Sequence, residues 1–180
     1  MIARRIRAWI PGLRVRRWVA IALGGAGLLV ACAAGWIALP LPAEVASPPP
    51  VPRLVMEDRA GLPLRATRAA DGSRGGWTPL AEVDPRLVQA FLAAEDHRYF
   101  GHYGVDLRSV GRALRDNVAG GRRAGASTLS MQTARLLVPT GRTVPGKLRQ
   151  ALWALRLEAN LPKRAILEQY VNRVPLGRAV

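Results

Sequence analysis

The sequence predicts a mainly α-helical protein with a transmembrane helix at its N-terminus. Two observations predict this: no residue from Trp18 to Ala43 is charged, and apolar residues recur with a helical period in most of the chain after Trp77. A short β-hairpin is expected between the two helical parts, where Pro and Gly interrupt the periodicity. The length of 180 residues allows one modest globular domain in addition to the membrane segment.

The N-terminal segment has the charge pattern of a signal anchor. Residues 1–17 carry six Arg and no acidic residue, and about 20 apolar residues suffice to cross a bilayer as a helix. Trp18 and Trp36 lie where interfacial aromatic residues are expected. The positive-inside rule then keeps residues 1–17 in the cytoplasm, makes 18–41 a single transmembrane span and places the following residues outside. A cleaved signal peptide is less favoured, because its apolar core is shorter, roughly 7 to 15 residues.

Cys32 is the only cysteine, so the chain can form no intrachain disulfide. It follows Leu29-Val30-Ala31, which together with Cys32 is similar to a bacterial lipoprotein cleavage site, and lipidation of this cysteine stays an open alternative. The sequence remains apolar through Leu39, whereas a processed lipoprotein usually becomes polar at once. We therefore favour a small residue inside the transmembrane helix.

The formal net charge of +15 is unevenly distributed. Residues 117–157 contain no acid but seven basic residues: Arg122, Arg123, Arg135, Arg142, Lys147, Arg149 and Arg156. An acid-free basic window outside the membrane suits an anionic ligand or the anionic leaflet beneath it. Solvated helix faces are the alternative for any single residue, and we expect them for Arg123 and Arg156. A DNA-binding helical domain is disfavoured by the export signal that precedes it.

Residues 42–76 are expected to form a Pro-rich linker and a short hairpin. The segment from Ser47 to Pro52 contains four prolines and predicts a stiff, extended spacer. Residues 53–57 and 62–67 flank a turn at 58–61, which is the pattern of two short paired strands.

Residues 77–180 are expected to form the globular domain, with five helices. The first begins after Asp84, a good N-cap, with Pro85 at the first helical position, and we expect it to close near Phe100. The others are expected at 105–119, from Ser127 or Thr128 to before Pro139, at 145–160 and from Pro162 onward. Apolar residues share one face in each, and such a face usually packs on the core: Leu107, Val110, Leu114 and Val118; Leu129, Leu136 and Leu137; Leu148, Leu152, Leu155 and Ala159; Ile166, Leu167, Tyr170 and Val171.

Glu95 is the candidate general base. It lies four residues beyond Phe91 and eight beyond Leu87, at the end of the apolar face of its helix. A carboxylate there is expected to be partly desolvated, which disfavours its charged form and suits it to accept a proton near neutral pH. The alternative interpretation is an exposed Glu at a frayed helix end.

A second polar motif, Gly125-Ala126-Ser127-Thr128, introduces a helix that bears Gln132 and Arg135. Ser and Thr cap free amides, and a helix N-terminus attracts anions, although most such sequences are ordinary caps. The motifs around it are more specific than this motif alone. The pattern Glu-Asp-x-x-aromatic-x-x-His-x-Gly precedes it, and a Lys-bearing helix and the segment from Lys163 to Asn172 follow it. From about Arg53 onward, this order and spacing resemble the peptidoglycan glycosyltransferase domain (glycosyltransferase family 51) of class A penicillin-binding proteins, most of all their 1C branch.

The resemblance implies a lysozyme-like glycosyltransferase fold for residues 77–180. It also implies polymerisation of lipid II, a membrane-bound disaccharide-peptide precursor, into glycan strands with inversion at the anomeric carbon. Glu95 would deprotonate the acceptor hydroxyl, and Arg135, Arg142 and Lys147 would stabilise the lipid-pyrophosphate leaving group. The resemblance also implies a set of substrate-binding residues: Asp96, His102, Ser127, Thr128, Gln132, Arg135, Arg142, Lys147 and Gln150.

The resemblance also bears on cofactors, partners and location. The resemblance allows a divalent metal, Mg²⁺ or Mn²⁺, on the leaving group. It implies no organic cofactor and no metal-ligating residue in the chain. The implied partners are lipid II, the growing glycan strand, the membrane through a single span and other cell-wall synthases, with no nucleic acid. The domain is expected in the bacterial periplasm, anchored in the inner membrane.

Two positions depart from the family pattern. Met131-Gln132 stands where the family has Gln-Gln. Gln150 stands where the third motif, typically Arg-Lys-x-x-Glu, has its Glu, and an amide can neither carry charge nor transfer a proton. The change is typical of the 1C branch, which favours tolerated variation, while a catalytically weak lipid II-binding scaffold is the competing hypothesis. Glu158 follows about 12 Å further along the helix and is not expected to substitute.

Bifunctional relatives carry a penicillin-sensitive transpeptidase, recognised by Ser-x-x-Lys and Lys-Thr-Gly. Neither motif occurs in these 180 residues, and Val180 precedes the last glycosyltransferase motif of the family. We therefore expect an N-terminal fragment of a larger enzyme, with a glycosyltransferase domain incomplete at its C-terminus.

Overall fold

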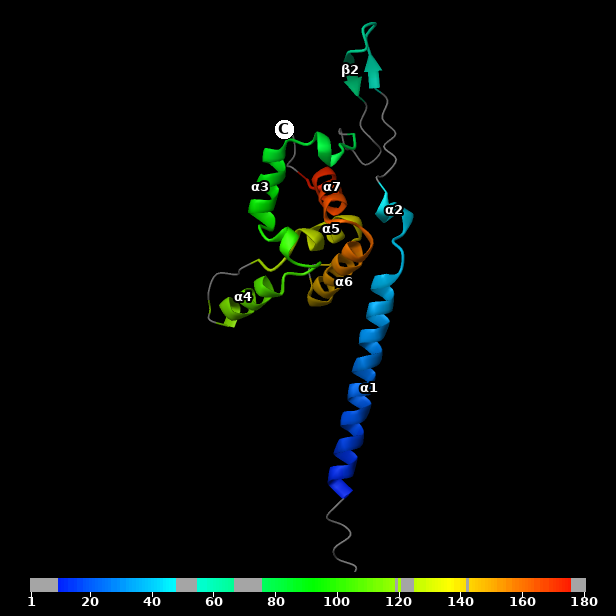
Figure 1. Ribbon diagram of the computed structural model, residues 1–180, viewed down its shortest axis with the longest axis vertical. Helices are drawn as coiled ribbons and strands as arrows, with labels where there is room; N and C mark the ends of the chain where they lie inside the picture. Colours follow the sequence, from blue (N-terminus) through cyan, green and yellow to red (C-terminus); the bar gives the residue numbers. More distant parts are fainter. Residues whose placement is uncertain are drawn as a thin grey trace, which may run out of the picture. The chain divides into compact units, whose positions relative to one another are not determined.

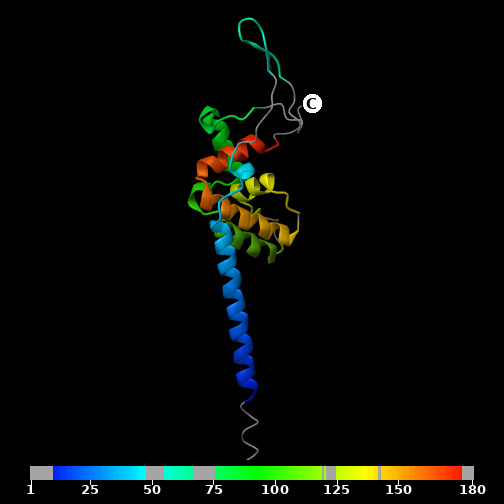
Figure 2. The same cartoon turned by 90° about the vertical axis from the view of Figure 1, so that its right-hand side faces the viewer.

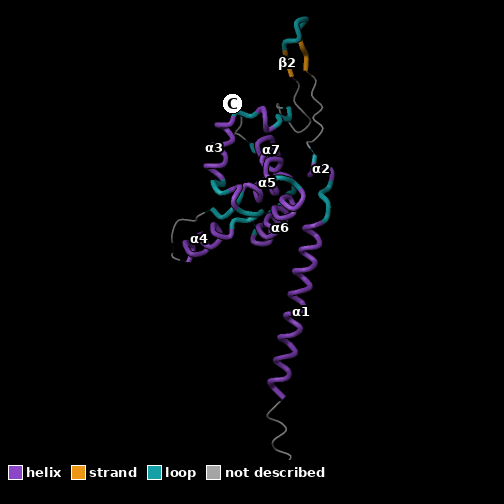
Figure 3. Tube along the Cα trace, in the orientation of Figure 1, coloured by secondary structure: helices purple, strands orange, loops and turns teal. Residues whose placement is uncertain are grey.

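The computed structural model describes residues 10–47, 55–66, 76–118, 120, 125–141 and 143–175. Within this part of the chain the protein is mainly α-helical, as predicted, and strand occurs only in one two-stranded sheet (Figures 1 and 3). Two 3₁₀ helices, η1 and η2, lie beside α3 in the sequence. The helices are α1 (Ile10–Ala38), α2 (Ala43–Ala46), η1 (Leu80–Glu82), α3 (Pro85–Glu95), η2 (Tyr99–Gly101), α4 (Leu107–Val118), α5 (Leu129–Leu137), α6 (Val144–Asn160) and α7 (Lys163–Arg173).

The chain divides into two compact units, Met1–Leu39 and Pro40–Val180. In the first, α1 contains the segment Val15–Ala38, whose 24 residues have a mean hydropathy of 2.0. By length and composition this helix can cross a membrane, a property that signal sequences share. Cys32 lies on it as a free, exposed thiol.

In the second unit, two short strands pair near its start. Strand β1 (Val55–Glu57) runs antiparallel to β2 (Pro63–Ala66), with Val55 opposite Ala66. Asp58 closes the connecting turn, because its carboxylate accepts hydrogen bonds from the amides of Ala60 and Leu62, both at 2.8 Å.

The core of the second unit lies among its last three helices. Helix α5 packs against both α6 and α7, and the three lie together in both views (Figures 1 and 2). The inward faces predicted for α5 and α7 are confirmed, since Leu129, Ile166, Leu167 and Tyr170 are buried. Within the described residues, the buried apolar cluster consists of Val45, Tyr99, Leu129, Ala134, Leu157, Ile166, Leu167 and Tyr170.

The apolar faces predicted for α4 and α6 do not pack on this core. Leu107 on α4 is 78% exposed and Leu148 on α6 is 64% exposed. Helix α6 instead turns Gln150, Ala154 and Leu157 inward, because this face contacts α5, whose own interior side carries the small residues Ser130, Thr133 and Ala134. The apolar residues of α4 and α6 are therefore free to line a surface groove, described below.

Arg156 is another difference from the sequence prediction, because it is buried and does not lie on a solvated face. Its guanidinium donates a hydrogen bond of 2.7 Å to the carbonyl of Pro40 and lies over the ring of Trp153, 5.1 Å from the centroid. This basic side chain ties α6 to the beginning of the second unit.

Helix α3 begins as predicted, with the Asp84 carboxylate accepting a 2.8 Å bond from the amide of Arg86 and Pro85 at its first position. It ends at Glu95, five residues before the expected Phe100. Asp96 leaves the helix with φ −161° and ψ 77°, which turns its side chain toward α5.

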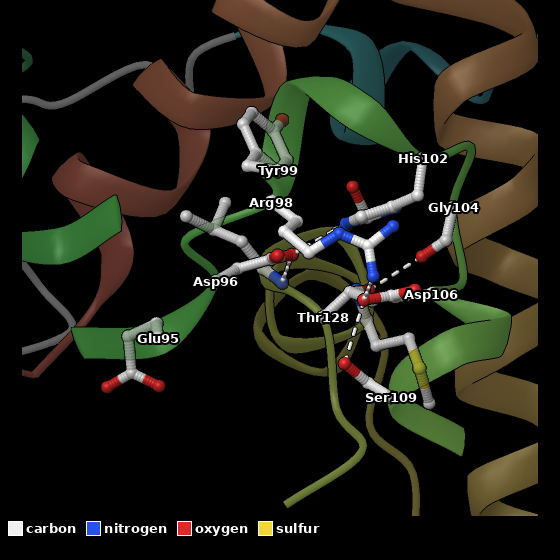
Figure 4. Close-up of polar contacts among 12 residues, drawn as sticks. Glu95, Asp96, Arg98, Tyr99, His102, Gly104, Asp106, Ser109 and Thr128 are labelled. Atoms are coloured by element: carbon white, nitrogen blue, oxygen red, sulfur yellow. Dashed lines mark hydrogen bonds and ion pairs between the residues drawn. The ribbon is translucent and has the colours of Figure 1, made fainter. Parts of the chain in front are cut away.

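The Asp96 carboxylate joins three segments (Figure 4). One of its oxygens accepts a 3.0 Å bond from the backbone amide of Leu129, at the start of α5, and a 2.9 Å bond from His102 Nε2. The side chains of Asp96 and His102 are only 6% and 5% exposed. Since the carboxylate only accepts, the imidazole donates through Nε2, which fixes its tautomer in this arrangement.

Gly104 packs the loop after His102 closely against α5 and α6. Its carbonyl accepts a 2.6 Å bond from Thr128 Oγ1, and its φ of +60° favours glycine. A Cβ here would lie 2.9 Å from the backbone nitrogen of Leu155. The loop can therefore approach α6 only because this position has no side chain.

We predict that Asp96→Ala lowers the free energy of unfolding by about 2–3 kcal/mol, because it leaves the Leu129 amide and His102 without their shared acceptor. Asp96→Asn, which keeps one acceptor, should lose less. Urea unfolding followed by tryptophan fluorescence measures both. His97→Ala, at the neighbouring exposed position, is the control; an Asp96→Ala protein as stable as this control would contradict the structural role of Asp96.

Candidate active site

Side chains from α3, α4, α5 and α6 line one polar cleft of about 480 Å³. Seven of the ten predicted site residues meet there: Glu95, Asp96, Ser127, Gln132, Arg135, Lys147 and Gln150. The remaining lining residues are Ala93, Ala94, His97, Arg112 and Gly125. The three other predicted residues differ: His102 and Thr128 are not among those that line the cleft, and Arg142 lies outside the described residues.

Glu95 reaches the cleft from the last turn of α3. The predicted desolvation is wrong, because the side chain is exposed; the core contact of this helix is made one turn earlier, by Phe91 against Tyr170. Figure 4 shows the Glu95 carboxylate pointing away from the Asp96 cluster. A carboxylate in this position is accessible to a bound substrate.

Gln132 holds the Glu95 side chain. Its amide nitrogen donates a 2.5 Å hydrogen bond to Glu95 Oε2, and its amide oxygen lies 3.5 Å from the hydroxyl of Tyr170 on α7. Tyr170 is 1% exposed and meets Phe91 edge to face, with ring centroids 5.5 Å apart. A contact chain therefore runs from the buried core to the candidate base.

Three basic side chains line the same cleft from three helices: Arg112 on α4, Arg135 on α5 and Lys147 on α6. The Lys147 ammonium donates a short hydrogen bond to Ser127 Oγ. Among the described residues that line the cleft, Glu95 and Asp96 are the only acids, and the Asp96 carboxylate is already occupied by the Leu129 amide and His102. The cleft therefore has an excess of positive charge and can attract an anionic group.

Sequence reasoning did not single out Arg112. Helix α4 carries two other arginines, Arg108 and Arg115, and Arg98 precedes the helix, so the sequence alone gives no reason to prefer one position. Only the tertiary structure distinguishes Arg112, by placing it on the cleft that residues of α5 and α6 also line.

Thr128 and His102 lie behind the cleft and act on its framework. Thr128 is the N-cap of α5, where Oγ1 accepts a 3.2 Å bond from the amide of Met131 and donates to the carbonyl of Gly104. His102 is bound to Asp96. In this structure both residues hold the segments that carry Glu95 and Ser127.

Gln150 lies on the cleft but is 4% exposed, and its amide nitrogen donates a 2.8 Å bond to Thr140 Oγ1. Glu158 is not on the lining. Its carboxylate accepts bonds from Ser130 Oγ at 2.5 Å and from the Lys163 ammonium at 2.7 Å. Glu158 therefore does not supply the negative charge missing at Gln150.

Tyr99 lies beside the contacts that Glu158 makes with Ser130 and Lys163. Its hydroxyl donates to the carbonyl of Lys163 at 2.9 Å, and the Lys163 ammonium lies 4.3 Å from the ring centroid. Burial raises the pKa of Tyr99 well above its usual range, and the nearby Glu158 and Asp96 carboxylates add to this, although a hydrogen bond with Ser130 opposes it. Tyr99 therefore stays neutral near pH 7 and holds the Lys163 carbonyl through its hydroxyl.

The end of the C-terminal motif binds the segment that precedes α3. The Glu168 carboxylate accepts bonds from Trp77 Nε1 at 2.8 Å and from the Leu80 amide at 2.9 Å. Asn172 bonds both the amide and the carbonyl of Thr78, each at 2.8 Å. The sequence contained this motif, but only the structure gives these two residues a role, in docking residues 77–80 on α7.

An apolar groove of about 560 Å³ adjoins the polar cleft. Gly125, Ser127 and Lys147 line both. The other groove residues come from the exposed apolar faces of α4 and α6 and from neighbouring segments: Val105, Leu107, Val110, Ala113, Asn117, Ala126, Met131, Val144, Leu148 and Ala151. A continuous surface therefore changes from polar and basic to apolar at Lys147.

Comparison with known proteins identifies the family. The Transglycosylase family matches residues 63–180. The chain is 40% identical over 178 residues to the biosynthetic peptidoglycan transglycosylase of Rhodospirillum centenum, covering 95% of this chain and 68% of that protein. It is also 40% identical over 172 residues to penicillin-binding protein 1C of Escherichia coli, covering 93% of this chain but only 22% of that protein. The resemblance seen in the motifs is confirmed, and the chain belongs to the transglycosylase family of peptidoglycan glycosyltransferases.

Proposed function

We propose that this protein polymerises lipid II into glycan strands, with inversion at the anomeric carbon and Glu95 as general base. The observation that carries the proposal is the exposed Glu95 carboxylate, held by Gln132 at 2.5 Å on a cleft that three basic side chains line. Membership of the family and the names of its relatives, which are peptidoglycan transglycosylases and penicillin-binding proteins, support the substrate class.

In the proposed reaction, Glu95 takes the proton of the acceptor hydroxyl as that oxygen attacks the anomeric carbon of the donor sugar. The bond between this carbon and the pyrophosphate oxygen breaks, and the lipid pyrophosphate leaves with the electron pair. Attack opposite the leaving group inverts the configuration. Arg135 and Lys147 stabilise the charge that develops on the pyrophosphate, and Arg142, outside the described residues, is proposed for the same role. Ser127 positions Lys147 through their hydrogen bond.

The described residues provide few ligands for the divalent metal that the resemblance allows. Within that part of the chain, no group of three His, Cys, Asp or Glu side chains could hold a metal ion. Asp96 is committed to His102 and the Leu129 amide, and Gln150 replaces a carboxylate. We therefore assign the leaving-group role to the basic side chains and derive no step through a metal.

The apolar groove supports a lipid-linked substrate. Lys147 lies where the polar cleft meets the groove, so a pyrophosphate bound by this ammonium can direct an attached prenyl chain along the groove. Burying such a chain there releases water from exposed apolar side chains, at roughly 25 cal/mol per Å².

The same proposal includes the placement of the protein. Residues 1–17 lie in the cytoplasm and 18–41 anchor the chain in the bacterial inner membrane, which the composition of α1 supports. Residues 42–76 form the linker with a short hairpin, and 77–180 form a lysozyme-like glycosyltransferase domain in the periplasm. Its partners are lipid II, the growing strand and other cell-wall synthases.

We predict that Glu95→Gln lowers the rate of glycan polymerisation at least about 100-fold, because an amide cannot accept the proton and general base catalysis contributes 10²–10⁴-fold. The measurement uses the complete membrane protein in detergent with labelled lipid II. Since Glu95 is exposed, the variant should unfold at the same temperature as the wild type. Wild-type polymerisation by Glu95→Gln would exclude Glu95 as the base.

A weakly catalytic lipid II-binding scaffold is the second candidate, favoured by the neutral Gln150 on the cleft. If Gln150 is a tolerated variation, wild-type protein polymerises lipid II, and Gln150→Glu changes the rate less than tenfold. A wild-type protein that binds lipid II without product, together with a Gln150→Glu variant that polymerises it, would instead establish the scaffold.

We predict that Leu148→Ser raises the KM for lipid II about fivefold when the substrate carries its full prenyl chain, and much less when the chain is shortened. The expected size corresponds to about 1 kcal/mol of lost apolar contact. Val118→Ser is the matched control, because Val118 is also exposed but does not line the groove. Equal effects of Leu148→Ser on the two substrates would contradict the prenyl-binding role of the groove.

A further inference from the structure

Arg112 lines the polar cleft, but no step of the reaction proposed above uses it. It does not line the apolar groove. Within the described residues no carboxylate pairs with it, and its hydrogen-bond partner is the hydroxyl of Ser109, 3.0 Å from Nη2. It is therefore a positive charge that the described part of the protein leaves available to a ligand.

The orientation of Arg112 is set by a chain of hydrogen bonds. Asp106 Oδ2 accepts a 2.7 Å bond from Ser109 Oγ (Figure 4), while its other oxygen accepts from the amide of Arg108 at 3.0 Å. Because the Ser109 proton points at Asp106, the lone pairs of Ser109 Oγ are free to accept from Arg112. The hydroxyl thus fixes one edge of the guanidinium and leaves its other donors for a ligand.

Asp106 is itself well anchored. It is 3% exposed and forms an ion pair with Arg98 at 3.3 Å. Burial favours its neutral form, but the bonds from Ser109 and the Arg108 amide, with the charge of Arg98, outweigh burial and lower the pKa of Asp106. It therefore stays a carboxylate near neutral pH and keeps the Ser109 proton directed toward it.

Arg115, one turn further along α4, is different. It is bound to Asp116 at 3.3 Å, its side chain is 77% exposed, and it does not line the cleft. Arg115 is thus paired with a carboxylate and lies away from the cleft, whereas Arg112 is bound to a hydroxyl and lines the cleft. This makes Arg115 a matched control for Arg112.

We propose that Arg112 binds the pyrophosphate of the donor substrate from the α4 side of the cleft, as a third basic residue beside Arg135 and Lys147. A guanidinium presents paired donors that match phosphate oxygens. Three positive charges from three helices suit a group that gains negative charge as the glycosidic bond forms. This inference rests on the proposed function, because that function supplies the pyrophosphate.

The first test measures polymerisation of lipid II by the complete protein. Arg112→Ala should lower kcat/KM at least tenfold, Arg112→Lys should recover part of the loss because it keeps the charge, and Arg115→Ala should remain within twofold of wild type. Equal rates for Arg112→Ala and Arg115→Ala would overturn the inference while leaving the proposed function intact, provided that the wild type forms glycan.

The second test measures binding alone, with fluorescent lipid II and the Glu95→Gln background, in which turnover is expected to be at least about 100-fold slower. Adding Arg112→Ala should weaken binding about tenfold, and adding Arg115→Ala should not change it. The same comparison with the prenyl alcohol that lacks pyrophosphate should show no effect of Arg112. Unchanged lipid II binding, or an equal loss for the prenyl alcohol, would overturn the inference, whether or not the wild type polymerises.

Discussion

The buried carboxylate of Asp96 is the interaction on which the arrangement of the site depends. It receives the first amide of α5 and the imidazole of His102, so the end of α3, the start of α5 and the loop between η2 and α4 converge on one group. Burying a charge is favourable only when its hydrogen bonds are satisfied. This requirement gives the three segments one relative position, and the cleft lies beside them.

Two consecutive acids thus have opposite environments. Asp96 is enclosed and hydrogen-bonded, whereas Glu95 is exposed and bound to a single side chain, Gln132. The helix ends between them, and this change of backbone direction sends the two carboxylates apart (Figure 4). The framework around Asp96 can therefore be rigid while the adjacent Glu95 carboxylate remains exposed on the cleft.

The secondary-structure elements and the family were predicted from the sequence more accurately than the way the helices pack. Asp84, Thr128 and Pro162 marked helix starts correctly, because caps act within a few residues. The end of α3 was missed, since Asp96 leaves the helix for a partner 33 residues away. The apolar faces of α4 and α6 were placed on the core, because periodicity identifies an apolar face but not what covers it.

The candidate site was predicted through its motifs, and seven of its ten residues do meet in one cleft. The exposure of Glu95 was not predicted, because local periodicity does not indicate where a neighbouring helix stops. Arg112 was not predicted either. Its distinction from Arg115 arises only when α4, α5 and α6 come together, which is a property of tertiary structure.

Lys147 stands at the boundary between the polar cleft and the apolar groove. A ligand that spans both must carry its anionic group where its hydrocarbon begins, because the ammonium occupies one fixed point along the surface. Water-soluble sugar phosphates would fill only the polar half, and uncharged lipids only the apolar half. In the function proposed above, this boundary would therefore distinguish amphiphiles by the position of the junction between their head and tail.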